Sequence, residues 1–267
     1  MTVDLQRNFG LRDDIVAYWS DRASTFDSSP SHGMANAEER QAWADLIGSA
    51  IGPAPRSVLE LASGTGEISR VLAELGYSVT GLDFAEPMLD RARAKLAGYP
   101  NVRLRLGDAE NCMERDASYD AVISRHLVWT LLSPEETLRD WFRVLKPGGT
   151  LVVLDGNWSE PTPLGRLIMP LVRLLDRFSS KRSPLSADMM QRHRTILRQL
   201  PFADGLTEKR LTVLLKEAGF TSIRRLSRRG VARAQRRAGS LSDALRHFGQ
   251  HYVYLSATRP NEPPANQ

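Results

Sequence analysis

Short apolar runs alternate with helical patterns through the middle of this 267-residue chain. Strands are expected at Ser57–Leu61, Ser78–Leu82, Val102–Leu106, Tyr119–Ser124 and Thr150–Asp155. Between them, apolar residues recur at helical spacing, as in Ile68, Val71, Leu72 and Leu75. Strand–helix alternation of this kind produces a mostly parallel sheet with helices on both faces. The pattern therefore predicts an α/β fold.

The alternation stops after Asp155. The segment from Asn157 to Gly205 carries helical signals and clustered Pro, Ser and Arg, but no convincing strand. A helix is expected again from Thr207, followed by strands at Thr221–Leu226 and Tyr252–Thr258. We predict one seven-stranded, mostly parallel sheet with a helical cap inserted beside the sheet edge where ligands bind.

The predicted division of the chain follows these changes of pattern. It comprises an N-terminal helical segment that closes over the ligand (1–56), a ligand-binding core (57–156), a helical cap that contacts the second substrate (157–205), the rest of the core (206–259) and a tail (260–267). Within the core, Ser133-Pro-Glu-Glu predicts a capping box at the start of the helix that precedes the fifth strand.

Composition excludes several classes of protein. A single cysteine, Cys112, excludes a disulfide framework and a multi-cysteine zinc site. The N-terminus lacks the apolar core of a signal peptide, and the most apolar stretch, Leu164–Leu175, is too short and too often interrupted to span a bilayer. We therefore expect a soluble, cytoplasmic protein without a transmembrane segment.

Positive charge is concentrated in one part of the chain. The net charge is +5, and 18 Lys or Arg residues stand against 5 acids between Arg166 and Arg237. Such a stretch can attract nucleic acid, anionic lipid or an acidic small molecule, or can form ordinary solvated helix faces. Charge alone does not choose among these roles.

Three strand ends carry residues suited to a nucleoside. The first strand runs into Glu60-Leu-Ala-Ser-Gly64-Thr-Gly66, the second ends at Asp83, and the third is followed by Gly107-Asp108. Ligands of parallel sheets bind beyond the carboxyl ends of the strands, where glycines permit close backbone approach and a carboxylate accepts ribose hydroxyls. A dinucleotide fingerprint would need Gly or Ala where Ser69 stands, and no phosphate loop is present. A nucleoside without a pyrophosphate, such as S-adenosylmethionine, is therefore favoured.

Five motifs in register carry a family resemblance. They are Glu60-Leu-Ala-Ser-Gly-Thr-Gly, Gly81-Leu-Asp-Phe, Gly107-Asp-Ala-Glu, Tyr119-Asp-Ala-Val and Arg143-Val-Leu-Lys-Pro-Gly-Gly. Together they resemble the class I S-adenosylmethionine-dependent methyltransferases, with a Rossmann-like fold. The nearest subgroup contains the ubiquinone/menaquinone-type and many small-molecule methyltransferases. The resemblance is strong from Ser57 to Asp155 and looser from Leu206 to Thr258.

The resemblance implies a role for each matching position. Near the methionine end of the cofactor it places Glu60, Gly64, Gly66, Ser124 and Arg125, and it assigns the ribose hydroxyls to Asp83. Phe84, Met88, Asp108 and the backbone of Ala109 would adjoin the adenine. Tyr18 would close over the cofactor, as similar aromatic residues do in relatives.

Methyl transfer from a sulfonium is an in-line displacement, so the protein mainly aligns the acceptor and excludes water. A general base is needed only where the acceptor must lose a proton, and His126 is the best-placed candidate, ahead of His32 and His193. Three residues are expected around the acceptor: Trp129, Asp155 and Trp158. The absence of metal-ligand spacing predicts a metal-free reaction.

The sequence restricts the identity of the methyl acceptor less than it restricts that of the cofactor. The Asn/Asp-Pro-Pro-Tyr/Phe signature of amino-methylating nucleic-acid and protein-glutamine enzymes is missing, because Ser124-Arg-His-Leu stands after the fourth strand. A capped pocket favours a small-molecule acceptor and makes nucleic acid an unlikely partner. The basic amphipathic region 164–198 keeps peripheral membrane contact and a lipid or isoprenoid-quinone acceptor open. Two further hypotheses are methylation of structured RNA and a non-catalytic protein that only binds the cofactor.

Overall fold

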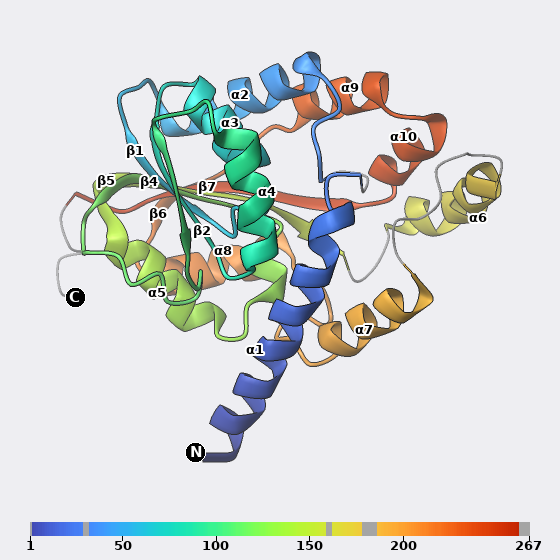
Figure 1. Cartoon of the computed structure of the whole chain (residues 1–267), viewed down its shortest axis with the longest axis horizontal. Helices are drawn as coiled ribbons and strands as arrows, with labels where there is room; N and C mark the ends of the chain where they lie inside the picture. The colour runs from blue at the N-terminus through green and yellow to red at the C-terminus, as the bar shows by residue number, and fades with distance from the viewer. Residues whose placement is uncertain (1, 29–31, 159–161, 178–185, 262–267) are drawn as a thin grey trace.

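The computed structural model describes residues 2–28, 32–158, 162–177 and 186–261 (Figure 1). It contains one seven-stranded sheet in the order β3-β2-β1-β4-β5-β7-β6. The strands are β1 (Ser57–Leu61), β2 (Ser78–Asp83), β3 (Val102–Leu106), β4 (Tyr119–Arg125), β5 (Leu145–Asn157), β6 (Thr221–Arg225) and β7 (His251–Thr258). Strands β1 to β5 pair in parallel, whereas β7 is antiparallel to both β5 and β6. The predicted seven-stranded, mostly parallel sheet is confirmed.

Helices surround this sheet. They are α1 (Thr2–Arg22), α2 (Ala37–Ile51), α3 (Glu67–Glu74), α4 (Glu86–Leu96), α5 (Pro134–Val144), α6 (Pro163–Arg177), α7 (Ala187–Leu197), α8 (Glu208–Glu217), α9 (Arg229–Ala238) and α10 (Leu241–Phe248), with short 3-10 turns η1 (Ala23–Thr25) and η2 (Val128–Thr130). In Figure 1, α2, α3 and α9 lie above the sheet, and α5 and α8 lie below it. Helices α6, α7 and α10 lie on the right of this view, and α1 runs from its centre toward the bottom.

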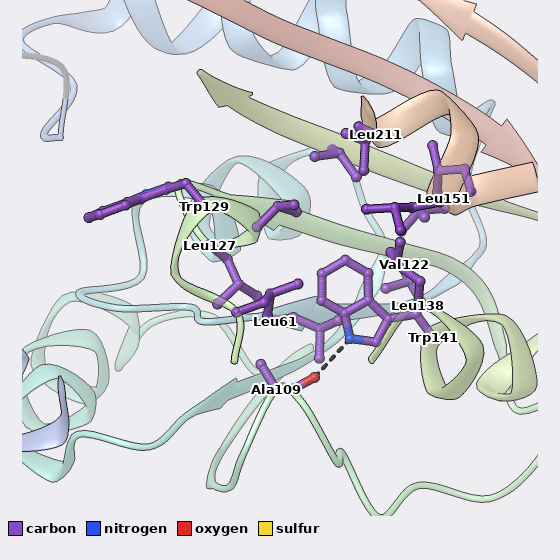
Figure 2. Close-up of a cluster of buried hydrophobic side chains, with 14 of the residues drawn as sticks. Leu61, Ala109, Val122, Leu127, Trp129, Leu138, Trp141, Leu151 and Leu211 are labelled. Carbon is purple, nitrogen blue, oxygen red and sulfur yellow. Dashed lines mark hydrogen bonds between the residues drawn. The ribbon is translucent and has the colours of Figure 1, made fainter. Parts of the chain in front are cut away.

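Successive side chains of each central strand supply two separate cores, because strand side chains point alternately to opposite faces. Leu59 and Val122 belong to a core that also contains Trp141 of α5 and residues of α8 (Figure 2). Val58 belongs to a second core, with Ile47 of α2 and residues of α3. Burial on both faces explains why central strands such as β1 and β4 read as continuous apolar runs.

Two parts of the fold differ from the expectation. Strand β5 begins at Leu145 instead of the expected Thr150, so it includes the Lys-Pro-Gly-Gly segment after α5. Helices α9 and α10 were not expected between β6 and β7. In the part of the chain that the structure describes, no helix has the length and apolar character needed to cross a membrane.

Candidate active site

The loop from β1 to α3 forms the floor of the site. Gly64 and Gly66 adopt φ angles of 54° and 81°, in the left-handed region that favours glycine. A Cβ atom at Gly66 would lie 2.8 Å from Cδ1 of Leu96 and 3.1 Å from Cβ of Ala92, both on α4. Glycine at position 66 therefore serves the backbone turn and the close packing of α4 together.

Asp83 ties this loop to the end of β2. Its Oδ2 atom accepts a hydrogen bond from the Gly64 N–H at 2.8 Å, and its Oδ1 atom accepts one from the Ala85 N–H at 2.9 Å. Burial raises the pKa of Asp83 to about 6, although the backbone donors favour the carboxylate. Phe84 is partly buried, and Met88 is buried against Ala85.

Glu60 lies in β1, just before this loop, and its pKa is shifted further than that of Asp83. Its side chain is buried, and its Oε2 atom accepts a hydrogen bond from the Ser69 hydroxyl. Burial raises the pKa of Glu60 to about 8, so the carboxyl is largely protonated at neutral pH. At the end of β4, the Arg125 guanidinium packs 4.9 Å from the ring centroid of Trp43.

A small cavity joins these elements. The lining residues are Phe26, His32, Glu60, Ala62, Ser63, Gly64, Thr65, Glu67, Ile68, Arg125 and His126. The buried hydroxyl of Ser63, which lines this cavity, has no hydrogen-bond partner among the described residues, and neither has that of Ser124, which lies outside the lining. An unpartnered hydroxyl and a buried carboxyl in one cavity fit a ligand with a polar, charged end, and the amino-acid end of S-adenosylmethionine has that chemistry.

Asp108 and Ala109 follow β3 and are already engaged within the chain. Asp108 forms an ion pair with Arg12 of α1 and accepts a hydrogen bond from the Glu110 N–H at 2.8 Å. The carbonyl oxygen of Ala109 accepts a hydrogen bond from Nε1 of Trp141 at 2.8 Å (Figure 2). Helix α1 thus lies against the strand end to which the resemblance assigned the adenine.

A second cavity of about 190 Å³ adjoins the first. Its lining is rich in aromatic and imidazole rings and consists of Tyr18, Trp19, Arg22, His32, His126, Trp129, Trp158, His193, Asp243, Arg246, His247 and Gln250. We call it the aromatic cavity. His32 and His126 line both cavities.

His126 is held by its backbone at the junction of the two cavities. It has a φ of 59°, donates its N–H to the Leu154 carbonyl at 3.1 Å and accepts a hydrogen bond at its own carbonyl from Nε1 of Trp129 at 3.0 Å. Its imidazole stacks on that of His32, with 5.3 Å between ring centroids, and lies 4.8 Å from the ring of Trp158. The side chain is therefore presented between aromatic walls.

Asp155 holds two aromatic residues of the aromatic cavity in place, Trp158 directly and Trp129 through the η2 turn. Its Oδ2 atom accepts a hydrogen bond from the Val128 N–H at 2.7 Å, and its Oδ1 atom accepts one from Nε1 of Trp158 at 3.0 Å. The side chain is completely buried, which raises its pKa to about 6. Asp155 thereby positions Trp158 and the η2 turn that carries Trp129.

Tyr18 and His193 bring α1 and α7 into the aromatic cavity. Their rings lie 5.4 Å apart, and the ring of His193 lies 5.5 Å from that of Trp129. Burial and the nearby Arg22 guanidinium lower the pKa of His193, so its imidazole is neutral at pH 7. Tyr18 lines the aromatic cavity, beside the one that contains Glu60 and Gly64.

The structure gathers only some of the predicted residues in these two cavities, because Gly66, Asp83, Phe84, Met88, Asp108, Ala109 and Ser124 line neither. Glu60, Gly64, Arg125 and His126 share the smaller cavity, and His126 also shares the aromatic cavity with Tyr18. Six other residues of the aromatic cavity were not predicted from the sequence: Trp19, Arg22, Asp243, Arg246, His247 and Gln250. The last four lie on or beside the unexpected helix α10. Of these six residues, only Trp19 could have been inferred from the sequence, because it adjoins Tyr18.

Comparison with known proteins identifies the chain. Residues 59–153 match the methyltransferase domain family. The chain is 32% identical over 167 residues to a demethylmenaquinone methyltransferase of Clavibacter sepedonicus, covering 62% of this chain and 66% of the relative, just under two thirds. It is 30% identical over 203 residues to the demethylmenaquinone methyltransferase of Tropheryma whipplei (strain Twist), covering 74% of this chain and 80% of the relative.

A solved methyltransferase structure shares the fold. The structure of phosphoethanolamine N-methyltransferase 2 from Haemonchus contortus with S-adenosyl-L-methionine superposes with a TM-score of 0.56 at 15% identity, covering 89% of this chain and 59% of that chain. The chain belongs to the class I S-adenosylmethionine-dependent methyltransferases. Within that family it is of the ubiquinone/menaquinone methyltransferase type.

Proposed function

We propose that this protein transfers the methyl group of S-adenosylmethionine to a small, planar aromatic acceptor bound in the aromatic cavity. One observation carries the proposal: the cavity with a polar, glycine-rich floor and the aromatic cavity adjoin along His32 and His126. A donor in the first and an acceptor in the second would meet at that boundary, as in-line displacement requires.

The residues present fit the cofactor. Glu60, Gly64, Gly66, Ser124 and Arg125 would hold its methionine end, and Asp83 would accept its ribose hydroxyls. Phe84, Met88, Asp108 and the backbone of Ala109 would surround the adenine, with Tyr18 in the adjoining wall. The bound cofactor supplies an electrophilic methyl group.

The chain's own contribution is alignment, exclusion of water and removal of a proton. Three indole rings, those of Trp19, Trp129 and Trp158, offer apolar faces on which a planar acceptor stacks. The imidazole of His126 would accept the proton of an acceptor hydroxyl as that oxygen becomes nucleophilic.

The test is to incubate the purified protein with methyl-labelled S-adenosylmethionine and a fractionated extract of its source cells. Label in an aromatic small-molecule fraction supports the proposal, and mass spectrometry then identifies the product. Label confined to RNA or protein contradicts it. No label in any fraction, despite binding of S-adenosylhomocysteine, would favour a non-catalytic cofactor-binding protein.

An isoprenoid quinone is a second candidate acceptor. Four leucines at helical spacing on α6 are exposed: Leu164 by 54%, Leu167 by 79%, Leu171 by 49% and Leu174 by 49%. An exposed apolar stripe suits contact with a lipid surface, where isoprenoid substrates reside, and the relatives from Clavibacter and Tropheryma are named for demethylmenaquinone. Assays with a demethylated quinol in micelles, against a water-soluble short-chain analogue, distinguish the two candidates.

A further inference from the structure

A groove of about 920 Å³ lies between α9 and β7. Its walls include five arginines (Arg225, Arg228, Arg229, Arg233 and Arg236), together with His251, Tyr252 and Tyr254. Of the described residues that line it, none is acidic. We call it the arginine groove.

The sequence of α9 places this charge in a row. Arg229, Arg233 and Arg236 follow one another at helical spacing, while Val231 and Ala234 on the other side of the helix are buried. At a rise of about 1.5 Å per residue, the three arginines span roughly 10 Å along the helix. A row of that length reaches more than one phosphate group.

Two arginines of the row are not neutralised by nearby acids. Glu38 pairs with Arg237, and Glu39 accepts a hydrogen bond from Gln235 at 3.0 Å. The side chains of Arg229 and Arg233 form no hydrogen bond or ion pair with any part of the chain that the structure describes. Like charges held together repel one another, and a bound anion relieves that repulsion.

At one end of the groove, the Arg228 side chain is held in place by two neighbouring residues. The Arg228 guanidinium lies 3.6 Å from the ring centroid of Tyr252 and donates a hydrogen bond to Oε1 of Gln235 at 2.8 Å. Tyr252 also contacts Trp158, with 5.9 Å between ring centroids. Gln250 lines the arginine groove and the aromatic cavity. The groove and the cavity proposed for the acceptor therefore adjoin at Gln250, and the Tyr252–Trp158 contact links their walls.

We propose that the arginine groove binds a small ligand that carries at least two phosphate groups. Guanidinium groups recognise phosphate through paired, charge-assisted hydrogen bonds, and the row on α9 presents them in series. The proposal concerns binding and does not depend on methyl transfer. It adds an anion site beside the aromatic cavity that the nucleoside motifs do not supply.

The experiment is calorimetric titration of the full chain with pyrophosphate at fixed low ionic strength. The test variant is R229Q/R233Q. The matched control is R91Q/R103Q, which removes two exposed arginines from α4 and from β3 at the opposite edge of the sheet. Circular dichroism and titration with S-adenosylhomocysteine establish that both variants are folded.

We expect saturable binding of one pyrophosphate that is unchanged in the control and about tenfold or more weaker in the test variant, since two charge-assisted contacts are lost. Absence of saturable pyrophosphate binding, or equal affinity in the two variants, overturns the proposal. Parallel titrations with a short RNA and with anionic lipid vesicles show which kind of molecule supplies the phosphate groups that the groove binds. Binding that is confined to RNA or vesicles assigns the groove to a macromolecule and also overturns the proposal.

Discussion

Asp83 is buried, yet both of its carboxylate oxygens accept backbone hydrogen bonds, one of them from the loop that contains Gly64. Loss of the carboxylate removes that tie and the proposed ribose contact. We expect Asp83→Ala to weaken S-adenosylhomocysteine binding by ~2–3 kcal/mol, about 30- to 150-fold. Calorimetry on the folded variant measures this, and an unchanged affinity would mean that the ribose lies elsewhere.

Glu60 predicts a proton-linked affinity. With a pKa of about 8, its carboxyl is protonated at pH 7 in the free protein. The ammonium group of a cofactor beside it favours the carboxylate, so binding should release about one proton at pH 7. Titrations in buffers of different ionisation enthalpy count the protons released. Glu60→Gln serves as the control, and buffer-independent heats in the unmodified protein would contradict the assignment.

His126 can be tested without disturbing the backbone. Its φ of 59° is tolerated by asparagine, so His126→Asn should keep the turn and remove the base. If the acceptor loses a proton, we expect kcat to fall about 100-fold and the acidic limb of its pH profile to disappear, with little change in KM. A variant that keeps the wild-type profile would exclude the role.

At the scale of single residues, the predictable part of the site is the part that is local in sequence. Gly64 and Gly66 lie in the loop after β1, and Asp83 is the last residue of the neighbouring strand β2, so the positions of two adjacent strand ends place them together. The aromatic cavity combines α1, the β4 end, α7 and α10. No local pattern indicates that Tyr18 meets His193, because that contact depends on how two helices pack beyond the sheet.

At the scale of single elements, the N-terminus of α5 is capped by a residue that is distant in the sequence, although the local sequence predicted a cap. The Ser-Pro-Glu-Glu sequence at Ser133 predicted a capping box, but the Ser133 side chain makes no capping hydrogen bond. Glu110 instead accepts hydrogen bonds from the Leu132 and Ser133 N–H groups at 3.0 and 2.9 Å. The predicted capping box at α5 is therefore wrong, whereas Ser240 and Asp243 form one at α10.

Helix α9 escaped prediction for a compositional reason. Its buried side chains are small or polar, namely Val231, Ala232, Ala234 and Gln235, and the exposed positions are mainly arginine. Such a helix has little of the large-apolar periodicity from which helices are recognised. The central strands β1 and β4 were easier to predict, because burial on both faces makes them continuous apolar runs.

The packing of α6 on α10 yields a prediction for a whole element. A Cβ atom at Gly165 would lie 2.5 Å from the carbonyl oxygen of Gly249. We expect Gly165→Ala to shift α6 and lower the free energy of unfolding by about 1–3 kcal/mol. Gly10→Ala is the matched control, because a Cβ atom there meets no atom within 4 Å, and should stabilise α1 by up to about 1 kcal/mol. Thermal unfolding compares the two, and equal effects would refute the packing argument.

At the scale of the molecule, three buried acids set a common pH dependence. Burial raises the pKa of Asp83 and of Asp155 to about 6, and that of Glu60 to about 8. At these three sites the folded state binds more protons than the unfolded state above about pH 4, so they lower stability as pH rises, and together they outweigh the opposite contribution of His247, whose pKa burial lowers to about 4. Between pH 5 and pH 7 each aspartate contributes about 1 kcal/mol to the decrease.

Denaturant unfolding of the ligand-free protein across this pH range measures the effect. The double variant D83N/D155N should make the profile less steep, since neither amide titrates, and the remaining slope should reflect Glu60. A stability that increases from pH 5 to pH 7 would contradict the burial-driven shifts.

The position of β7 between β5 and β6 affects how the protein is made. Although it completes the interior of the sheet, β7 follows the other six strands in the chain. On the ribosome, β5 and β6 therefore emerge with facing edges whose N–H and C=O groups have no partner strand, and such edges invite intermolecular pairing. The nascent chain remains exposed to aggregation until β7 has been synthesised, so its demand for chaperones should peak late in translation.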